Sequence, residues 1–286
     1  MGIFSGLLSM FGWGTSDFLA AKSSRQIGHV LTYFWTQLAF LLITLVYFVI
    51  KLPTFNINEI LKFLIFLIPA GFLFLVGTLA FYKGFIGGQV SLVSPIGASW
   101  AMVTVVLSVT FFKEVLAINQ IVAIALIILG IILVSVNLKE LLQIKKFVFL
   151  TGVKEGLIAM IAWGISLFLI VPASKTLGWF FPVFALKFFG LLFLVIYILF
   201  SKQSLRINFQ PSLLALLFLI GFLDIVAFFG YSSGVRGEYV SIIASVAASF
   251  PLVTILLARI FLKERMVLNQ VFGMVGIVAG LILISI

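Results

Sequence analysis

The chain repeats its own residue pattern at an offset of 150 positions, without an insertion or a deletion. The repeat is clearest at glycine, tryptophan and polar positions. Equivalent residues in the two copies include Met10 and Met160, Trp13 and Trp163, Gly14 and Gly164, Thr104 and Thr254, Lys113 and Lys263, Gln120 and Gln270, and Gly130 and Gly280. Both copies are mostly apolar, so the sequence predicts a duplicated helical bundle with one plan in each half.

The composition indicates that most of the chain is surrounded by lipid. Hydrophobic residues make up 64% of the 286 residues and charged residues 9%, whereas a soluble domain carries about 25% charged residues. The net charge of +10 comes mainly from Lys and Arg in short gaps between apolar runs, where they suit lipid headgroups. We therefore expect membrane lipid as a partner and no nucleic acid. One His and no Cys argue against a metal site, and we expect no cofactor.

The apolar runs predict the fold class. A spanning helix needs about 20 apolar residues, and continuous runs do not suit a β-barrel. We expect an all-α integral membrane protein with ten transmembrane helices at 2–21, 30–50, 63–82, 89–112, 115–136, 156–174, 177–200, 211–235, 239–262 and 266–286. Five spans per copy is an odd number, so the copies form two inverted five-helix repeats. The expected boundaries are 1–137 for the first repeat, 138–153 for a linker and 154–286 for the second repeat.

The orientation in the membrane is left open by the charge pattern. An even number of spans places both termini on one side. Counted over the whole chain, Lys and Arg in the gaps favour termini outside the cell, but up to Lys113 the two sides carry equal numbers.

Two motifs resemble a known family. The run Gly12-Trp13-Gly14-Thr15-Ser16-Asp17-Phe18 is similar to the first-helix signature of the drug/metabolite transporter superfamily, EamA branch. The end of each copy resembles the end of that family's repeat, with Phe111-Phe112-Lys113-Glu114, Gln120 and Gly130 in the first and Phe261-Leu262-Lys263-Glu264, Gln270 and Gly280 in the second.

The resemblance implies ten helices around a central cavity that opens alternately to either side of the cell membrane. It also implies cytosolic termini and movement of small organic solutes, mostly export of amino acids, amines or other metabolites, with uptake of choline-like nutrients in some members. Members often carry a basic residue early in the second helix. That position is Gln37 in the first copy and Lys187 in the second.

Charged residues inside apolar spans need a reason, because each costs about 2.5–3.5 kcal/mol on insertion scales. Asp224 and Lys187 lie deep in neighbouring spans with opposite charges. They form either a buried ion pair that fixes packing or a cavity site that binds a substrate amine or exchanges a proton. Asp17 is either a cavity residue or one that reaches the interface near Lys22. Arg259 can extend to the headgroups.

Tryptophans near the centre of a span also suggest a cavity. An indole N–H at mid-depth needs a hydrogen-bond partner, which lipid cannot provide. Trp13, Trp100 and Trp163 lie at such depths, and the repeat predicts that Trp13 and Trp163 face each other. An aromatic cavity suits flat, apolar or cationic solutes. The alternative is that the rings only pack against nearby glycines.

Small polar residues, prolines and tyrosines complete the candidate site. Ser99 and Ser249 are candidate solute ligands, although small residues also allow helices to approach closely. Pro95 and Pro251 are not equivalent by repeat, so they should bend the two halves unequally. We assign gating to these prolines and to three tyrosines near the gaps: Tyr82, Tyr231 and Tyr239. Glu114 and Glu264 each precede a helix and suit its positive N-terminal end, a structural role.

These features favour a secondary transporter, with a proton as a candidate coupling ion. No phosphate-binding loop motif occurs, so a gradient or exchange would provide the energy. An enzyme is disfavoured because the chain offers little for metal or nucleophile chemistry. A channel would favour rings of like residues. Duplication for size alone, without transport, is the remaining alternative.

Overall fold

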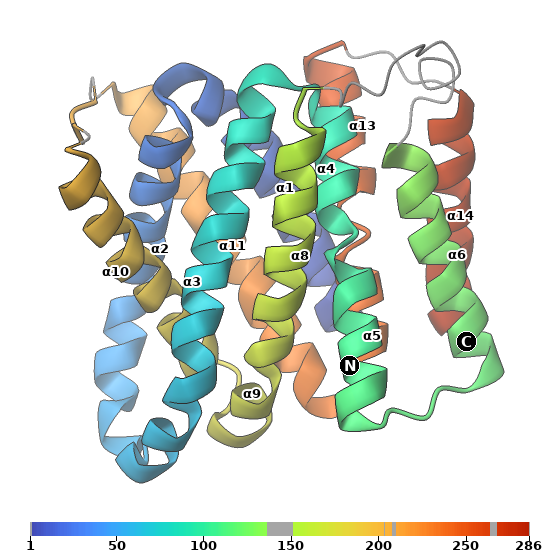
Figure 1. Cartoon of the computed structure of the whole chain (residues 1–286), viewed down its shortest axis with the longest axis horizontal. Helices are drawn as coiled ribbons and strands as arrows, with labels where there is room; N and C mark the ends of the chain where they lie inside the picture. The colour runs from blue at the N-terminus through green and yellow to red at the C-terminus, as the bar shows by residue number, and fades with distance from the viewer. Residues whose placement is uncertain (1, 136–150, 203, 208–209, 264–267, 286) are drawn as a thin grey trace.

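The computed structural model describes residues 2–135, 151–202, 204–207, 210–263 and 268–285. These residues form helices and connecting segments, with no strand among them (Figure 1). Residues 138–150 of the predicted linker, and Glu264, lie outside the described residues. The all-α fold class is confirmed for the part of the chain that the structure covers.

The helices of the first copy follow the predicted order. They are α1 (Gly2–Ile27), α2 (His29–Lys51), the 3₁₀ turn η1 (Leu52–Thr54), α3 (Ile57–Gly87), α4 (Val90–Ala98), α5 (Trp100–Phe112) and α6 (Ile118–Ser135). The second copy contains α8 (Val153–Leu169), α9 (Val171–Leu177), α10 (Phe181–Ser201), α11 (Pro211–Gly237), α12 (Val240–Ala247), α13 (Pro251–Phe261) and α14 (Leu268–Ser285).

Three of the predicted spans are interrupted. Ser99 separates α4 from α5, residues 248–250 separate α12 from α13, and Ile170 separates α8 from α9. A proline lies near each break. Proline lacks a backbone N–H and its ring clashes with the preceding turn, so it interrupts a helix. Pro95 lies inside α4, whereas Pro251 begins α13, where a missing N–H leaves no helical bond unmade. The two equivalent breaks therefore differ in length.

Fewer helices have the length and hydropathy typical of a membrane span than the ten that the sequence predicted. Within the described residues, seven stretches are long and apolar enough to cross a membrane, and α6 and α14 are shorter apolar helices. Helix α1 is not among the seven, because its glycines, its serines and Asp17 lower its mean hydropathy. It packs against α2, α3, α11, α12 and α13. A helix enclosed by protein needs less apolar surface than one that faces lipid, which accounts for the polar residues of α1.

The two copies contact each other reciprocally. Thr104 Oγ1 donates a hydrogen bond to the Gly164 carbonyl at 2.9 Å, and its equivalent Thr254 donates to the Gly14 carbonyl at 3.0 Å. A Cβ on Gly14 would lie 2.6 Å from Val253 Cβ, and one on Gly164 would lie 2.5 Å from Val103 Cβ. Such mutual contacts are those of a two-fold relation, and small residues let the backbones approach this closely.

The same reciprocity pairs α6 with α14, which lie side by side at one edge of the bundle (Figure 1). Gly130 is against the Gly273 carbonyl, and its equivalent Gly280 is against the Ala123 carbonyl. The first helices of the copies, α1 and α8, run in opposite directions (Figure 1). Between the copies, α1, α3, α8 and α11 enclose the centre of the molecule.

Candidate functional site

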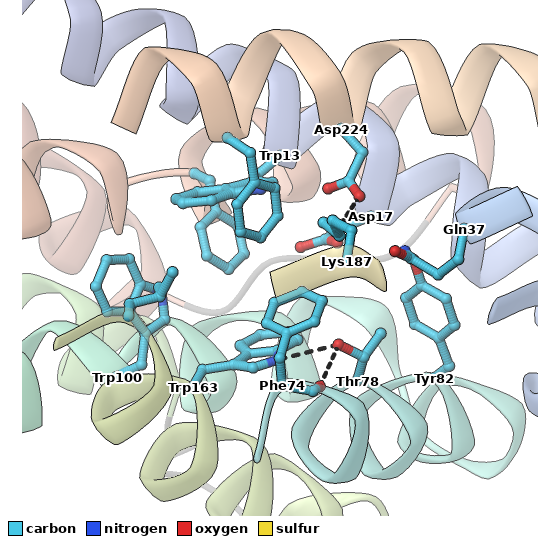
Figure 2. Close-up of a pocket in the computed structure, with 13 residues that line it drawn as sticks. Trp13, Asp17, Gln37, Phe74, Thr78, Tyr82, Trp100, Trp163, Lys187 and Asp224 are labelled. Carbon is cyan, nitrogen blue, oxygen red and sulfur yellow. Dashed lines mark hydrogen bonds and ion pairs between the residues drawn. The ribbon is translucent and has the colours of Figure 1, made fainter. Parts of the chain in front are cut away.

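A cavity of about 30 Å³ lies between the two copies (Figure 2). Water needs about 10–15 Å³ of such volume per molecule, so the cavity has room for about two waters. An organic solute would therefore require the walls to move. The lining residues are Trp13, Asp17, Gln37, Phe74, Thr78, Tyr82, Trp100, Trp163, Leu167, Lys187, Asp224, Phe228 and Phe250.

The lining consists almost entirely of repeat-equivalent positions. Tyr82 is the exception, since its equivalent Ser232 is not in the lining. The other residues form six pairs at an offset of 150: Trp13 and Trp163, Asp17 and Leu167, Gln37 and Lys187, Phe74 and Asp224, Thr78 and Phe228, and Trp100 and Phe250. The two halves of the cavity thus match in position and differ in chemistry, because each charged residue has a neutral residue at the equivalent position of the other copy.

Lys187 and Asp224 form an ion pair at the charged end of the cavity. Lys187 Nζ lies 2.5 Å from Asp224 Oδ2. The Lys187 side chain, on α10, is fully buried, and that of Asp224, on α11, is 14% exposed. Both readings left open by the sequence are compatible with this position, because the pair is buried and also lines the cavity. A buried charge of this kind is tolerated only because its partner compensates it.

Asp17 lines the cavity from the middle of α1 and does not pair with Lys22. It is 7% exposed. Among the described residues its side chain makes no hydrogen bond and no ion pair, although it lies within electrostatic range of Lys187 and Asp224. With these three groups ionised, the cavity holds two carboxylates and one ammonium group. The site therefore favours an additional positive charge.

Gln37 adds an unused hydrogen-bonding group at the same end. Its side chain is 1% exposed, and Oε1 has no hydrogen-bond partner within the described part of the chain. It lies beside Tyr82 in the cavity wall (Figure 2). A buried amide oxygen without a partner is uncommon, and such a group at a cavity can accept a hydrogen bond from a bound molecule.

The other end of the cavity is aromatic. The Trp13 ring lies 6.0 Å from the Trp100 ring and 5.0 Å from the Phe228 ring, both edge-on. Trp163 Nε1 donates a hydrogen bond to Thr78 Oγ1 at 3.0 Å, which satisfies a buried indole. Trp13 and Trp163 line the cavity from opposite copies, as Figure 2 shows. The structure places all three predicted tryptophans in the lining.

Several predicted residues lie away from the lining. Ser99 Oγ donates to the Pro95 carbonyl and Ser249 Oγ to the Ser245 carbonyl, each at 3.1 Å and each in the helix that precedes the break. The structure does not bring these serines to the cavity. Their hydroxyls instead satisfy carbonyls near the helix breaks, a common local alternative for serine.

The predicted gating residues are dispersed. Tyr82 is in the lining. Tyr231 is buried behind the lining residues, with its ring 5.8 Å from that of Trp100. Tyr239 is 41% exposed and precedes α12. Pro95 and Pro251 are buried at the helix breaks and do not line the cavity.

Glu114 joins the two copies at the end of the bundle where α5 ends. Its carboxylate accepts hydrogen bonds from the Val240 N–H at 2.7 Å, the Ser241 N–H at 3.1 Å and the Ser241 hydroxyl. The sequence correctly suggested a helix N-terminus but indicated the wrong helix. The carboxylate binds α12 of the other copy rather than α6, which follows it in the chain, because the packing of the copies brings α12 closer.

Sequence reasoning missed Phe74, Thr78, Leu167, Phe228 and Phe250. Aromatic and aliphatic residues in an apolar span do not stand out by composition. The repeat could have found Phe74, Leu167 and Phe250, since they are equivalent to the predicted residues Asp224, Asp17 and Trp100. It could not have found Thr78 and Phe228, which are equivalent to each other.

Comparison with solved structures supports the fold. One crystal structure of a protein superposes with a TM-score of 0.72 at 13% identity, covering 99% of this chain and 95% of that chain. An uncharacterised protein of Methanocaldococcus jannaschii is 38% identical over 76 residues. That match spans 27% of this chain and 56% of the length of the archaeal protein.

The model of the EamA-like transporter family matches residues 1–136 and 150–286, which correspond to the two copies. A family of membrane transporters for small solutes agrees with long apolar helices around a central cavity. The expected resemblance is therefore confirmed, and with it a multi-pass membrane location. This chain belongs to the EamA-like transporter family, within the drug/metabolite transporter superfamily.

Proposed function

We propose that the protein is a secondary active transporter that moves a small organic metabolite across the cell membrane by alternating access. The observation that carries the proposal is the central cavity, which both copies line and in which Asp17 has no hydrogen-bond or ion-pair partner among the described residues. A buried carboxylate in a membrane protein marks a substrate or ion pathway more often than a packing site.

We propose ten spans in two oppositely inserted five-helix units, with cytoplasmic termini. The reciprocal contacts of Gly14 and Gly164 support this topology, because they indicate a two-fold relation between the copies. An axis of this kind in the membrane plane allows one copy to rock against the other. The cavity would then open to one side or the other.

The solute we propose carries a positive amino group next to an apolar or aromatic part: an amine, an amino acid or an aromatic metabolite. Asp17 would bind the ammonium group and Gln37 a hydrogen-bond donor. Trp13, Trp100 and Trp163 would enclose the apolar part. Cation–π attraction from the indoles adds to the preference for a cation.

Export is the direction that we propose, with a proton as the coupling ion, since a carboxylate such as Asp17 can hold either a proton or a substrate ammonium. The alternative is uptake of a choline-like or other cationic nutrient. We propose no enzymatic activity. Flux measurements in proteoliposomes distinguish these classes: saturable, gradient-sensitive flux supports a carrier, and release of a chemically changed product supports an enzyme.

A ligand screen comes first in the experimental test. Amines, amino acids and aromatic metabolites are tested for an increase in the thermal unfolding temperature of the purified protein, since a ligand that binds the folded state stabilises it. The best ligand is then loaded into proteoliposomes for counterflow.

We predict that Asp17→Asn abolishes counterflow of that ligand without lowering the unfolding temperature, because Asp17 has no ionic partner to lose. Glu59→Gln is the matched control, since Glu59 pairs with Lys62 on the surface, away from the cavity. Counterflow that continues unchanged in the Asp17→Asn protein would refute this role. Asp224→Asn is also expected to abolish transport, but it leaves Lys187 unpaired and is a less specific test.

A further inference from the structure

The ammonium group of Lys187 is enclosed by aromatic rings as well as by Asp224. Nζ lies 3.9 Å from the ring centroid of Phe228, 4.3 Å from that of Phe74 and 5.1 Å from that of Phe40. These three rings and the Asp224 carboxylate are called the Lys187 cage. A cation within about 6 Å of a ring centroid is attracted by the ring face. Cages of aromatic rings are a recurrent way to bind free alkylammonium groups.

The fold does not require a cage at this position. The first copy has Gln37 where the second has Lys187, and the residues equivalent to Phe40 and Phe228 are Gly190 and Thr78. The first copy therefore places neither a cation nor these rings at the corresponding point. The cage is also composite, since Phe40 and Phe74 come from the first copy and Phe228 and Asp224 from the second.

Packing alone also does not explain the arrangement. Well-packed hydrophobic residues in place of a buried ion pair are often as stable or more stable. Here the lysine is fully buried, and its cage borders the cavity, because Phe74, Phe228 and Asp224 are all lining residues. A cation that entered the cavity would therefore meet the rings and carboxylate of this cage if Lys187 were not already there.

We infer that the Lys187 cage is a binding site for alkylammonium groups that the protein fills with its own side chain. By occupying the cage, Lys187 prevents free cations from binding to Asp224 and the three rings. Asp17 is left as the acidic group available to a solute. Lys187 is thereby a specificity-determining residue that limits the cavity to one free cation. This inference concerns binding in the resting protein and does not depend on which solute is transported or in which direction.

Removing the lysine side chain tests the inference. Lys187→Ala deletes Cγ, Cδ, Cε and Nζ, which together have the size and charge of n-propylammonium. We expect Lys187→Ala, purified as the full chain in detergent, to have a lowered unfolding temperature. Added n-propylammonium at about ten times its Kd should raise that temperature by about 2–3 °C. The wild-type protein sets the baseline, since its cage is occupied and only Asp17 is left to bind the cation, and its increase should be clearly smaller than that of Lys187→Ala.

Four controls make the result specific. Sodium at equal ionic strength and neutral n-propanol should not replace n-propylammonium. The double variant Lys187→Ala/Asp224→Asn should lose the response, because the cage then lacks its carboxylate. Lys175→Ala should not gain a response, since Lys175 is exposed and lies 5.3 Å from the single ring of Phe112.

Lys187→Ala protein that unfolds at the same temperature with and without n-propylammonium would overturn the inference. So would a double variant that folds while Lys187→Ala cannot be recovered even when n-propylammonium is present throughout purification. If neither variant folds, Lys187→Ser takes their place with ethylammonium as the probe, because serine lacks the atoms that correspond to Cδ, Cε and Nζ. A lack of stabilisation by ethylammonium then has the same meaning.

Discussion

At the scale of single residues, the hydrogen bond between Trp163 and Thr78 shows how the aromatic end of the cavity is fixed. Trp163 is 7% exposed, and its indole N–H donates to Thr78 Oγ1. The same hydroxyl donates to the Phe74 carbonyl at 2.9 Å. One threonine therefore connects an indole of the second copy to a helix of the first and holds the ring at the cavity wall.

We predict that Thr78→Val lowers the free energy of unfolding by about 1–3 kcal/mol, because it leaves a buried indole N–H without an acceptor. In a Trp163→Phe background the same change should have a much smaller effect, since no N–H remains to be satisfied. Thermal unfolding of the four proteins in detergent measures both effects. Equal effects of Thr78→Val in the two backgrounds would show that the hydrogen bond does not stabilise the fold.

The sequence predicted these residues unevenly, and the reasons are physical. Trp13, Trp100 and Trp163 could be placed in the cavity because an indole at mid-depth needs a polar partner. Phe228 could not, because a phenyl ring is equally stable against lipid or protein and its equivalent Thr78 was not predicted either. Ser99 and Ser249 could not be oriented, since the break after Pro95 and the break before Pro251 change the direction that each hydroxyl faces.

At the scale of helices, the contact of Glu114 with α12 joins one copy to the other. A carboxylate that accepts two backbone N–H groups at a helix start compensates both the unmade hydrogen bonds and the helix dipole. The helix that receives it is short, since α12 covers only Val240–Ala247 before the break. Short helices gain proportionally more from such a contact.

We expect Glu114→Ala to lower the free energy of unfolding by about 1–2 kcal/mol, the range for loss of a helix-terminal acceptor. Glu59→Ala serves as the comparison, because Glu59 lies in the first turn of α3 and pairs only with exposed Lys62. That change should stay within about 0.5 kcal/mol. A Glu114→Ala protein as stable as Glu59→Ala would show that the contact with α12 contributes little.

At the scale of the whole molecule, the order of the helices could be predicted from the repeat, but the distance between the copies could not. The offset of 150 identifies Gly14 and Gly164 as equivalent without indicating what each touches. In the structure they lie against Val253 and Val103, which are themselves equivalent. Contacts between distant parts of a chain depend on packing that no local pattern describes.

This reciprocity predicts equal effects from equivalent substitutions. Gly14→Ala and Gly164→Ala should each destabilise the protein by about 1–3 kcal/mol, because a new Cβ would overlap the valine and a carbonyl oxygen across the interface. Gly237→Ala is the control, since its Cβ would meet no atom within 4 Å. The unfolding temperatures of the three variants test this. One glycine tolerating alanine while the other does not would contradict the two-fold relation.

The unequal chemistry of the paired cavity positions has a consequence for the pose of any molecule inside. Asp17, Gln37 and Asp224 lie at the charged end of the cavity and the indole rings at the other, so turning a molecule end for end would move its polar head from carboxylates to hydrocarbon. A solute with one polar and one apolar end is thus held in a single orientation. Molecules with two like ends, such as linear diamines, do not match a cavity with two unlike ends. They are therefore suitable negative controls in a panel of candidate compounds.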